Sequence, residues 1–323
     1  MTTTFRRARL ALASAALAAT VAAVPVSAEE LFTVTLLGTG SPRPAPERNG
    51  PSTLVEVGGQ KLMFDMGRNN TVALYRAHIP LGAITAHFIT HMHSDHLNGL
   101  PDLYLTGWIG TPYAHRTRPF VVYGPKGTQE MMRHLYEAFS EDRRIRHADE
   151  KESLEAAAID AHDIEPGAVY ESGGVKVTAF LVSHGDLIQP AYGYKIEFKG
   201  HKVVLSGDTR YAKTVEQEAT GADLLIHEVA AVGGGADKLV ASQPFFRAVL
   251  DHHITPVDAG RLFARARPKL AVYSHIVVPG DFTGSASEQL ISETRKTYDG
   301  PLVVGEDLMR WRISDTGIAM DKL

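Results

Sequence analysis

The chain has 323 residues, fifteen histidines, no cysteine and a formal net charge of −4 at pH 7. The absence of cysteine excludes disulfides and thiolate ligands, so histidine and carboxylate must hold any zinc. An acidic chain has no general electrostatic attraction to phosphate backbones, and we therefore expect no nucleic-acid partner.

Residues 1–28 have the composition of an export signal. Three arginines precede an apolar run over residues 10–24, and Val26-Ser27-Ala28 fits a small-residue cleavage site. The run is shorter than the ~20 residues that span a bilayer, so we interpret it as a cleaved signal and not as a membrane anchor. Cleavage would leave 295 residues, numbered 29–323, as a single periplasmic or secreted domain of net charge −7. Arg6-Arg7 leaves the export route, Sec or twin-arginine, open.

The remaining chain alternates between short apolar segments rich in β-formers and amphipathic segments, a pattern that predicts an α/β fold. Predicted strands cover residues 31–37, 52–57, 61–65, 84–91, 120–123, 175–182, 192–198, 202–205, 223–226 and 269–273. Predicted helices cover residues 71–78, 97–107, 128–139 and 255–265. Gly58-Gly59 forms a hairpin turn, and Thr255 with Pro256 begins the last predicted helix. The charged residues 140–165 are interpreted as a solvated connector or a pair of helices.

The densest chemical signal is Thr90-His91-Met92-His93-Ser94-Asp95-His96, at the end of the strand predicted over residues 84–91. Because side chains alternate along extended backbone, His91 and His93 point to the same side. A turn at Ser94 could bring Asp95 and His96 round to face them. Imidazole and carboxylate suit zinc, and a cluster this dense can hold two ions. The competing interpretation is a polar loop whose histidines merely cap a strand and a helix.

Metal-binding residue types also follow the carboxyl ends of other predicted strands. Together with the first motif they are His91, His184, Asp208, Glu228 and His275. Layered α/β proteins gather their sites along this edge of the sheet. One such residue alone is usually an ordinary strand-end residue, but five independent strand ends are hard to explain as capping. The sequence therefore predicts one site that is assembled from distant segments.

These motifs resemble those of the metallo-β-lactamase superfamily over nearly the whole chain after residue 28. The motifs that carry the resemblance are Gly38-Thr39-Gly40, Phe64-Asp65-Met66-Gly67, residues 90–96, His184, Ser206-Gly207-Asp208-Thr209 and His275. Leu225-Ile226-His227-Glu228, followed by His253-Ile254-Thr255, is similar to the ribonuclease Z-like branch. The resemblance implies an αββα sandwich, in which two mixed sheets with flanking helices face each other and the site lies along one edge.

Within this branch the chain resembles the secreted metallo-β-lactamase-type arylsulfatases, on residues 100–108 and 182–188. Ribonuclease Z itself fits less well, because its substrate-clamping arm usually lies between the third-histidine motif and the Gly-Asp motif. In this chain the segment from His184 to Asp208 is filled by two predicted strands. Related cyclic-nucleotide phosphodiesterases share much of the framework.

The resemblance implies seven metal ligands in two sets. The sets are His91, His93 and His184 for one zinc, and Asp95, His96 and His275 for the other, with Asp208 bridging both. His253, oriented by Glu228, would give a proton to the leaving oxygen, and His252 is the rival for that role. Asp95, besides being a ligand, is counted with His253 and Glu228 as a catalytic residue.

Four other residues receive an interpretation from the same resemblance. Asp65 is expected to fix the metal-site loop by hydrogen bonds without being a ligand, and His227 is expected to be structural. Trp108 and Tyr113 either stack on an aromatic leaving group or pack under a loop.

We therefore predict a secreted hydrolase of small anionic esters with two zinc ions per chain, which lower the pKa of a shared water. An arylsulfatase is the main prediction, and a phosphodiesterase acting on a cyclic nucleotide or another small phosphodiester is the alternative. Sulfate and phosphate esters both present tetrahedral anionic oxygens, so the residues do not distinguish them. A non-catalytic metal-binding protein is less favoured, since such relatives lose ligands and all seven are present here. The expected partners are a small anionic ester and no nucleic acid, with no stable membrane anchor, and the branch suggests a homodimer.

Overall fold

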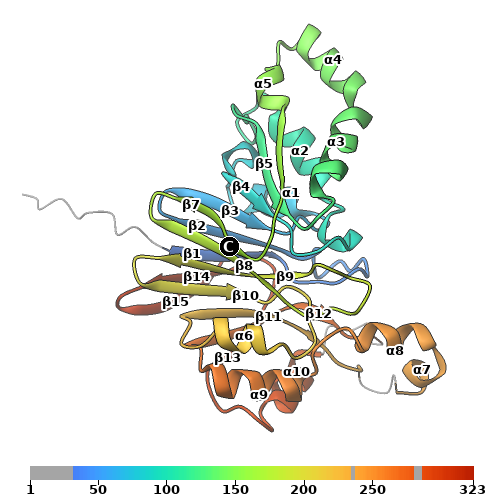
Figure 1. The fold of residues 1–323 in the computed structure, drawn as a ribbon, viewed down its shortest axis with the longest axis vertical. Helices are drawn as coiled ribbons and strands as arrows, with labels where there is room; N and C mark the ends of the chain where they lie inside the picture. Colours follow the sequence, from blue (N-terminus) through green and yellow to red (C-terminus); the bar gives the residue numbers. More distant parts are fainter. Residues whose placement is uncertain (1–31, 234–236, 280–285) are drawn as a thin grey trace, which may run out of the picture.

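A computed structural model of the chain describes residues 32–233, 237–279 and 286–323. The described residues form two β-sheets that lie face to face, with helices on the outer side of each sheet (Figure 1). The export signal predicted over residues 1–28 lies outside the described residues, so export stays a prediction. In the described part of the chain, no helix is long and apolar enough to cross a bilayer.

The first sheet has eight strands and is mixed. In spatial order they are β15 (Gly317–Lys322), β14 (Met309–Ser314), β1 (Phe32–Gly38), β2 (Ser52–Val57), β3 (Gln60–Phe64), β4 (Ala86–Phe88), β5 (Phe120–Gly124) and β6 (Ile159–Asp163). Neighbouring strands from β15 to β3 are antiparallel, whereas β3, β4, β5 and β6 run parallel.

The second sheet has seven strands and is also mixed. In spatial order they are β13 (Leu302–Val304), β12 (Leu270–Val277), β11 (Leu224–Ala230), β10 (His201–Leu205), β9 (Tyr192–Phe198), β8 (Val175–Leu181) and β7 (Gly167–Ser172). Strands β10 to β13 run parallel, and strands β7 to β10 form an antiparallel meander.

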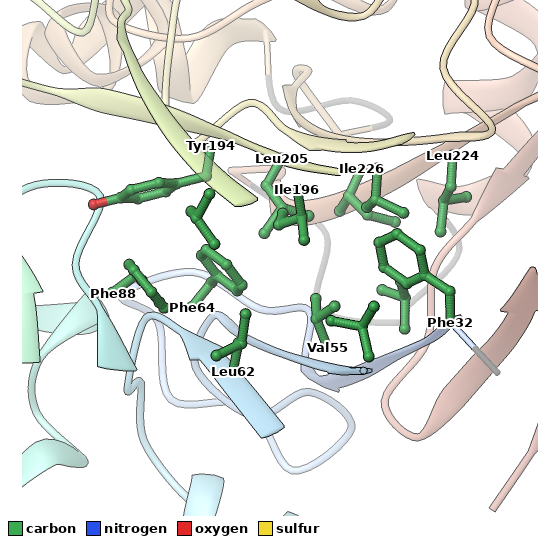
Figure 2. Packing of buried hydrophobic residues seen from close by; sticks show 14 of the residues in the cluster. Phe32, Val55, Leu62, Phe64, Phe88, Tyr194, Ile196, Leu205, Leu224 and Ile226 are labelled. Carbon is green, nitrogen blue, oxygen red and sulfur yellow. The ribbon is translucent and has the colours of Figure 1, made fainter. Parts of the chain in front are cut away.

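The largest apolar cluster fills the space between the two sheets (Figure 2). Val55 and Phe88 reach into it from the first sheet, and Tyr194 and Leu224 reach into it from the second. Because successive side chains of a strand point to opposite faces, each sheet can present one apolar face to this core. Removing both faces from water is the main contribution that holds the sheets together.

Two further apolar clusters lie between the sheets and their outer helices. The first sheet is covered by α1 (Asn70–Arg76), α2 (Leu100–Trp108) and α3 (Thr128–Ala138), and the second by α6 (Lys213–Glu218), α9 (Pro256–Ala266) and α10 (Ala286–Thr294). The remaining helices are α4 (Ser140–Asp149), α5 (Leu154–Ala157), α7 (Asp237–Ser242) and α8 (Pro244–Leu250), with short 3₁₀ turns η1 (Leu81–Ala83) and η2 (Ser94–His96). The four layers confirm the predicted αββα sandwich.

Most predicted elements are present close to their predicted bounds. Gly58 and Gly59 both have positive φ, 56° and 74°, as a two-residue hairpin turn requires. The Thr255 hydroxyl accepts a hydrogen bond from Asp258 N at 3.2 Å and so caps α9. The charged residues 140–165 form α4, α5 and β6, so this segment adds an edge strand to the first sheet and is not only a connector.

The strand predicted to end at His91 ends at Phe88. Beyond Phe88 the backbone leaves the ladder, since Thr90 N donates to Asp65 Oδ1 at 2.9 Å. The Thr90 carbonyl accepts from Tyr192 N, in the second sheet, at 2.9 Å. Ile89 continues the apolar pattern past the strand because its side chain is buried in the cluster between the first sheet and its outer helices.

Candidate metal centre

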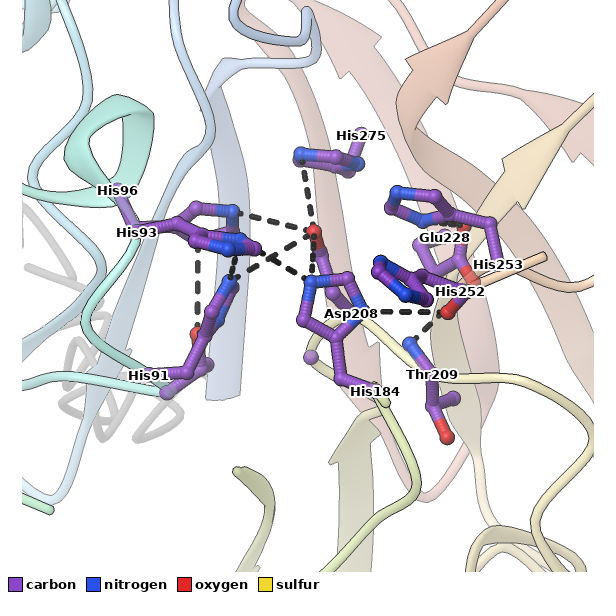
Figure 3. Close-up of polar contacts among 12 residues, drawn as sticks. His91, His93, His96, His184, Asp208, Thr209, Glu228, His252, His253 and His275 are labelled. Atoms are coloured by element: carbon purple, nitrogen blue, oxygen red, sulfur yellow. Dashed lines mark hydrogen bonds and ion pairs between the residues drawn. The ribbon is translucent and has the colours of Figure 1, made fainter. Parts of the chain in front are cut away.

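The loops that follow β4, β8 and β10 meet strands β11 and β12 at one edge of the two sheets (Figure 3). The residues that gather there are His91, His93, Asp95 and His96 after β4, His184 after β8, Asp208 after β10, Glu228 in β11, His253 before α9 and His275 in β12. Every site residue named from the sequence is therefore brought to one place, although the segments are far apart along the chain.

His91, His93 and His184 form the first group of possible ligands. His93 Nδ1 lies 2.9 Å from His91 Nε2 and 3.1 Å from His184 Nε2. Burial, together with neighbouring histidines, holds the pKa of His91 well below its usual range, and burial lowers the pKa of His184 to about 4. These two imidazoles are therefore neutral at pH 7, which is the form that binds a metal.

Asp95, His96 and His275 form the second group. His275 Nε2 lies 3.2 Å from Asp95 Oδ2, and His96 Nε2 lies 3.6 Å from the same oxygen. His96 Nε2 is buried and makes no hydrogen bond within the described residues, so a potential ligand atom faces the carboxylates of Asp95 and Asp208 without being engaged in a hydrogen bond. Two imidazoles and a carboxylate are a donor set that fits zinc.

Asp208 lies between the two groups (Figure 3). Its Oδ2 is 3.2 Å from His275 Nε2 and 3.4 Å from His96 Nε2. The same oxygen is 3.7 Å from His184 Nε2 and 3.9 Å from His91 Nε2. Burial opposes a charge on Asp208, but His275 and His96 outweigh burial and hold its pKa well below the usual range. One ionised carboxylate oxygen thus faces nitrogen atoms of both groups.

Zinc binding to the metal-free chain is expected to release a proton from His96. Burial disfavours protonation of His96, but Asp208 and Asp65 outweigh burial and raise its pKa well above the usual range. Because zinc must displace that proton, its affinity should fall as the pH is lowered. Calorimetric titration of zinc in buffers with different ionisation enthalpies measures the proton count. His96→Ala should release fewer protons, whereas His134→Ala, which removes an exposed histidine of α3, should release the same number as the parent. An unchanged count for His96→Ala would refute this expectation.

In two of the candidate ligands, the ring nitrogen that faces away from the centre has a protein partner that fixes the orientation of the ring. Asp65 Oδ2 lies 2.7 Å from His96 Nδ1, and the His252 carbonyl accepts from His184 Nδ1 at 3.1 Å. Such contacts select the tautomer whose Nε2 is available to a metal. Asp65 therefore supports the centre by hydrogen bonding, as the sequence predicted. The role of the His252 carbonyl has no signal in the sequence, because every residue carries a carbonyl.

The sequence predicted that Glu228 and His275 follow the ends of strands. In the structure both residues lie inside longer strands. β11 continues to Ala230 and β12 to Val277. A bulge between these strands places Ser274 and His275 opposite Glu228, and the φ of His275 is 42°. The extra residue interrupts the alternation of side chains and directs the His275 ring to the centre.

His253 and Glu228 form a buried pair beside the centre. His253 Nδ1 lies 3.0 Å from Glu228 Oε2, and Glu228 Oε1 accepts from Ile254 N at 2.9 Å. Burial opposes protonation of His253, but Glu228 outweighs burial and raises the pKa of His253 to about 9. The His253 ring centre is 5.0 Å from that of His184, so a protonated imidazole stands next to the first group.

Three other residues that the sequence singled out pack elsewhere. Trp108 is buried at the end of α2 against two alanines of α5, so it cannot stack on a leaving group. Tyr113 makes an edge-on contact with Tyr75, at 6.2 Å between ring centres. His227 is fully buried and its Nδ1 contacts the Glu228 carbonyl, as expected for a structural histidine.

Comparison with known proteins finds similarity to ribonuclease Z in sequence and to metallo-β-lactamase-fold proteins in structure. A family model described as "Anti-Pycsar protein Apyc1" matches residues 32–237. The chain is 32% identical over 282 residues to ribonuclease Z of Mycobacterium marinum, a match that covers 87% of this chain and 98% of that relative. The metallo-β-lactamase fold protein YhfI of Bacillus subtilis superposes with a TM-score of 0.67 at 18% identity, covering 87% of this chain and 99% of the other. Human tRNase Z, short form, superposes with a TM-score of 0.62 at 22% identity, covering 86% and 98%.

These similarities correct two expectations from the sequence. The preference for arylsulfatases over ribonuclease Z receives no support, since the relative that aligns over 98% of its length is named ribonuclease Z. The expectation of no nucleic-acid partner is wrong, because relatives with that name act on RNA. Net charge is a sum over the whole surface, whereas phosphate is attracted locally, so the acidic balance excludes no polyanion.

Proposed function

Because the chain belongs to the ribonuclease Z-like family of metallo-β-lactamase-fold hydrolases, and to the family of the Apyc1 model, we propose that it hydrolyses phosphodiesters at a two-zinc centre. The observation that carries the proposal is the place of Asp208, whose Oδ2 lies 3.2 Å from His275 Nε2 and 3.7 Å from His184 Nε2. The family is metal-dependent and typically uses zinc. Two bound zinc ions would lower the pKa of the attacking water and neutralise the ester oxygens.

In this proposal each group of three residues holds one ion. The ligands are His91, His93 and His184 for the first ion and Asp95, His96 and His275 for the second, with Asp208 shared. The ligand atoms within each group lie within 4.8 Å of one another, which is close enough to surround a single ion. Asp65 and the His252 carbonyl contact Nδ1 of His96 and His184, which leaves Nε2 of both imidazoles free to bind an ion.

His253 gives the proton to the leaving oxygen. Its Nδ1 contacts Glu228, so Nε2 is the nitrogen that can deliver a proton to the substrate. Glu228 keeps the imidazole charged at neutral pH, which is the form that a general acid needs. Glu228 Oε1 also accepts from Thr209 N at 3.3 Å, next to Asp208, and thereby fixes the acid relative to the shared carboxylate.

Phosphodiesters are placed ahead of aryl sulfates because an aligned relative is named for the cleavage of RNA. Residues between His184 and Asp208 form the β9–β10 hairpin inside the second sheet and not an extended arm. A short segment that is part of a sheet does not itself decide the size of the substrate. RNA and small phosphodiesters both belong to the proposed class, so an assay must include both.

The zinc-loaded chain is expected to turn over phosphodiesters faster than sulfate esters. The test compares bis-p-nitrophenyl phosphate, a cyclic nucleotide, a precursor tRNA and p-nitrophenyl sulfate at matched enzyme concentration. Asp208→Asn, which keeps the volume of the side chain and removes its charge, is the matched inactive control. Turnover of the sulfate with none on any phosphodiester would overturn the proposed function. The ratio of turnover on the precursor tRNA to turnover on the two small phosphodiesters shows whether the preferred substrate is large or small.

A further inference from the structure

Asp307 lies in the turn between β13 and β14, and its carboxylate accepts three hydrogen bonds. Oδ1 accepts from Thr39 N at 3.0 Å and from Thr39 Oγ1 at 2.7 Å, and Oδ2 accepts from Asn49 N at 2.6 Å. Asp307 belongs to none of the groups of possible metal ligands among residues 32–233, 237–279 and 286–323. A carboxylate this well bonded is held in place and in turn holds the backbone that donates to it.

Thr39, the residue that Asp307 holds, links the two sheets next to the metal centre. Thr39 follows β1 of the first sheet and is fully buried. Its carbonyl accepts from Ile276 N, in β12 of the second sheet, at 3.0 Å. Ile276 directly follows His275. A chain of contacts therefore runs from the Asp307 carboxylate through the backbone of Thr39 to the backbone of His275.

His275 depends on its backbone for its orientation more than His96 and His184 do. His96 and His184 each have a partner on the nitrogen that faces away from the centre. His275 Nδ1 is buried and has no hydrogen-bond partner within the described part of the chain. Its φ of 42° is unusual for a residue with a side chain and persists only where the surroundings impose it. The bulge at His275 also removes the regular ladder that would fix this residue.

We propose that Asp307 is a positioning residue for the second zinc site: by holding Thr39 it fixes Ile276 and thereby aims His275 Nε2 at Asp95 and Asp208. The inference rests on the proposed two-zinc function. It assigns a role at the centre to the β13–β14 turn, which is remote in sequence from all the motifs. A purely structural role would consist only in tying the end of β1 to this turn.

The test measures how tightly each zinc ion is held when the loaded chain is challenged with increasing concentrations of a chelator. In Asp307→Ala, one ion should be lost at ~10–100-fold lower chelator activity than in the parent, because a supporting contact is removed. The other ion, on His91, His93 and His184, should be held as in the parent. The matched control is Asp163→Ala, because the Asp163 carboxylate, at the end of β6, also accepts from two backbone amides, Gln129 N at 2.9 Å and Gly127 N at 3.1 Å. This control should keep both ions.

Two milder variants keep the test decisive if Asp307→Ala does not fold. Asp307→Asn keeps an acceptor for Thr39 but turns an N–H toward Asn49 N, and Thr39→Val removes the hydroxyl while keeping the shape and the backbone amide. Both should weaken the second ion by less than the alanine variant does. Cobalt substitution gives an independent signal, since the visible spectrum of the second site should change in each variant. The spectrum of the first site should not change.

The possible outcomes separate this inference from the proposed function. Two ions in the parent, with the second held equally tightly in all Asp307 and Thr39 variants, would overturn the role of Asp307 alone. An equal weakening of both ions, or an equal effect in Asp163→Ala, would show a general structural role and overturn it as well. A parent chain that holds a single ion would overturn both the two-zinc centre and the inference built on it.

Discussion

Asp208→Ala should bind fewer than two zinc ions and lose at least ~10³-fold in phosphodiester turnover. Its Oδ2 approaches nitrogen atoms of both groups, at 3.2 Å from His275 Nε2 and 3.7 Å from His184 Nε2. Without this oxygen both proposed zinc sites would lose a ligand, and no shared carboxylate would hold the two sites together. Metal content by mass spectrometry and kcat on bis-p-nitrophenyl phosphate measure the two effects.

Asp223→Ala is the matched control for this variant. Asp223 is also a buried carboxylate of the second sheet, but it precedes β11 at the opposite end from the centre. It lies 2.6 Å from Lys269 Nζ and accepts from Lys202 N at 2.8 Å. Its loss should lower thermal stability while leaving zinc content and kcat close to those of the parent. An Asp208→Ala protein that keeps two ions and a tenth of the parent's turnover would remove Asp208 from the bridging position.

The candidate ligands of the first motif could be predicted from the sequence because they lie in one short segment. Alternation along extended backbone and one turn place His91, His93, Asp95 and His96 without knowledge of the rest of the chain. By contrast, the 3.1 Å approach of His184 Nε2 to His93 Nδ1 depends on how the two sheets stack. The position of His184 after a predicted strand indicated that it joins the site, but spacing along the chain carries no information about which residue it contacts there.

The backbone around His275 could not be predicted, because its cause is a register shift between two strands. The apolar run up to Tyr273 looks like a strand that ends there, and only the pairing with β11 shows that it continues to Val277. Strand β14 likewise pairs with β1, with Phe32 opposite Ile313, although the two strands lie near opposite ends of the sequence. A carboxylate in the turn before β14 has the appearance of an ordinary turn residue, so Asp307 gave no signal.

His253→Ala is expected to lower turnover by ~10²–10⁴ for poor leaving groups and much less for good ones, since a stable leaving anion needs no proton. A series of aryl phosphodiesters with leaving groups of increasing pKa measures this dependence. Zinc content should not change, because neither of the two proposed sets of ligands includes His253. The matched control is His252→Ala, which removes the neighbouring ring but keeps the carbonyl that accepts from His184 Nδ1 at 3.1 Å. An equal loss across the series would assign the proton to another donor.

The pH profile tests the same role by an independent route. Glu228 raises the pKa of His253 to about 9 in the metal-free protein, although burial opposes it. A general acid is active while protonated, so turnover should fall as the pH rises through the pKa of His253. Two bound cations lower that pKa by repulsion, and the fall is therefore expected below pH 9 in the zinc-loaded enzyme. Glu228→Gln removes the charge that favours the protonated ring, so the pH at which turnover falls should be lower still in this variant. In His252→Ala the fall in turnover should occur at the same pH as in the parent. If turnover of Glu228→Gln falls at the same pH as turnover of the parent, the group whose deprotonation causes the fall is not His253.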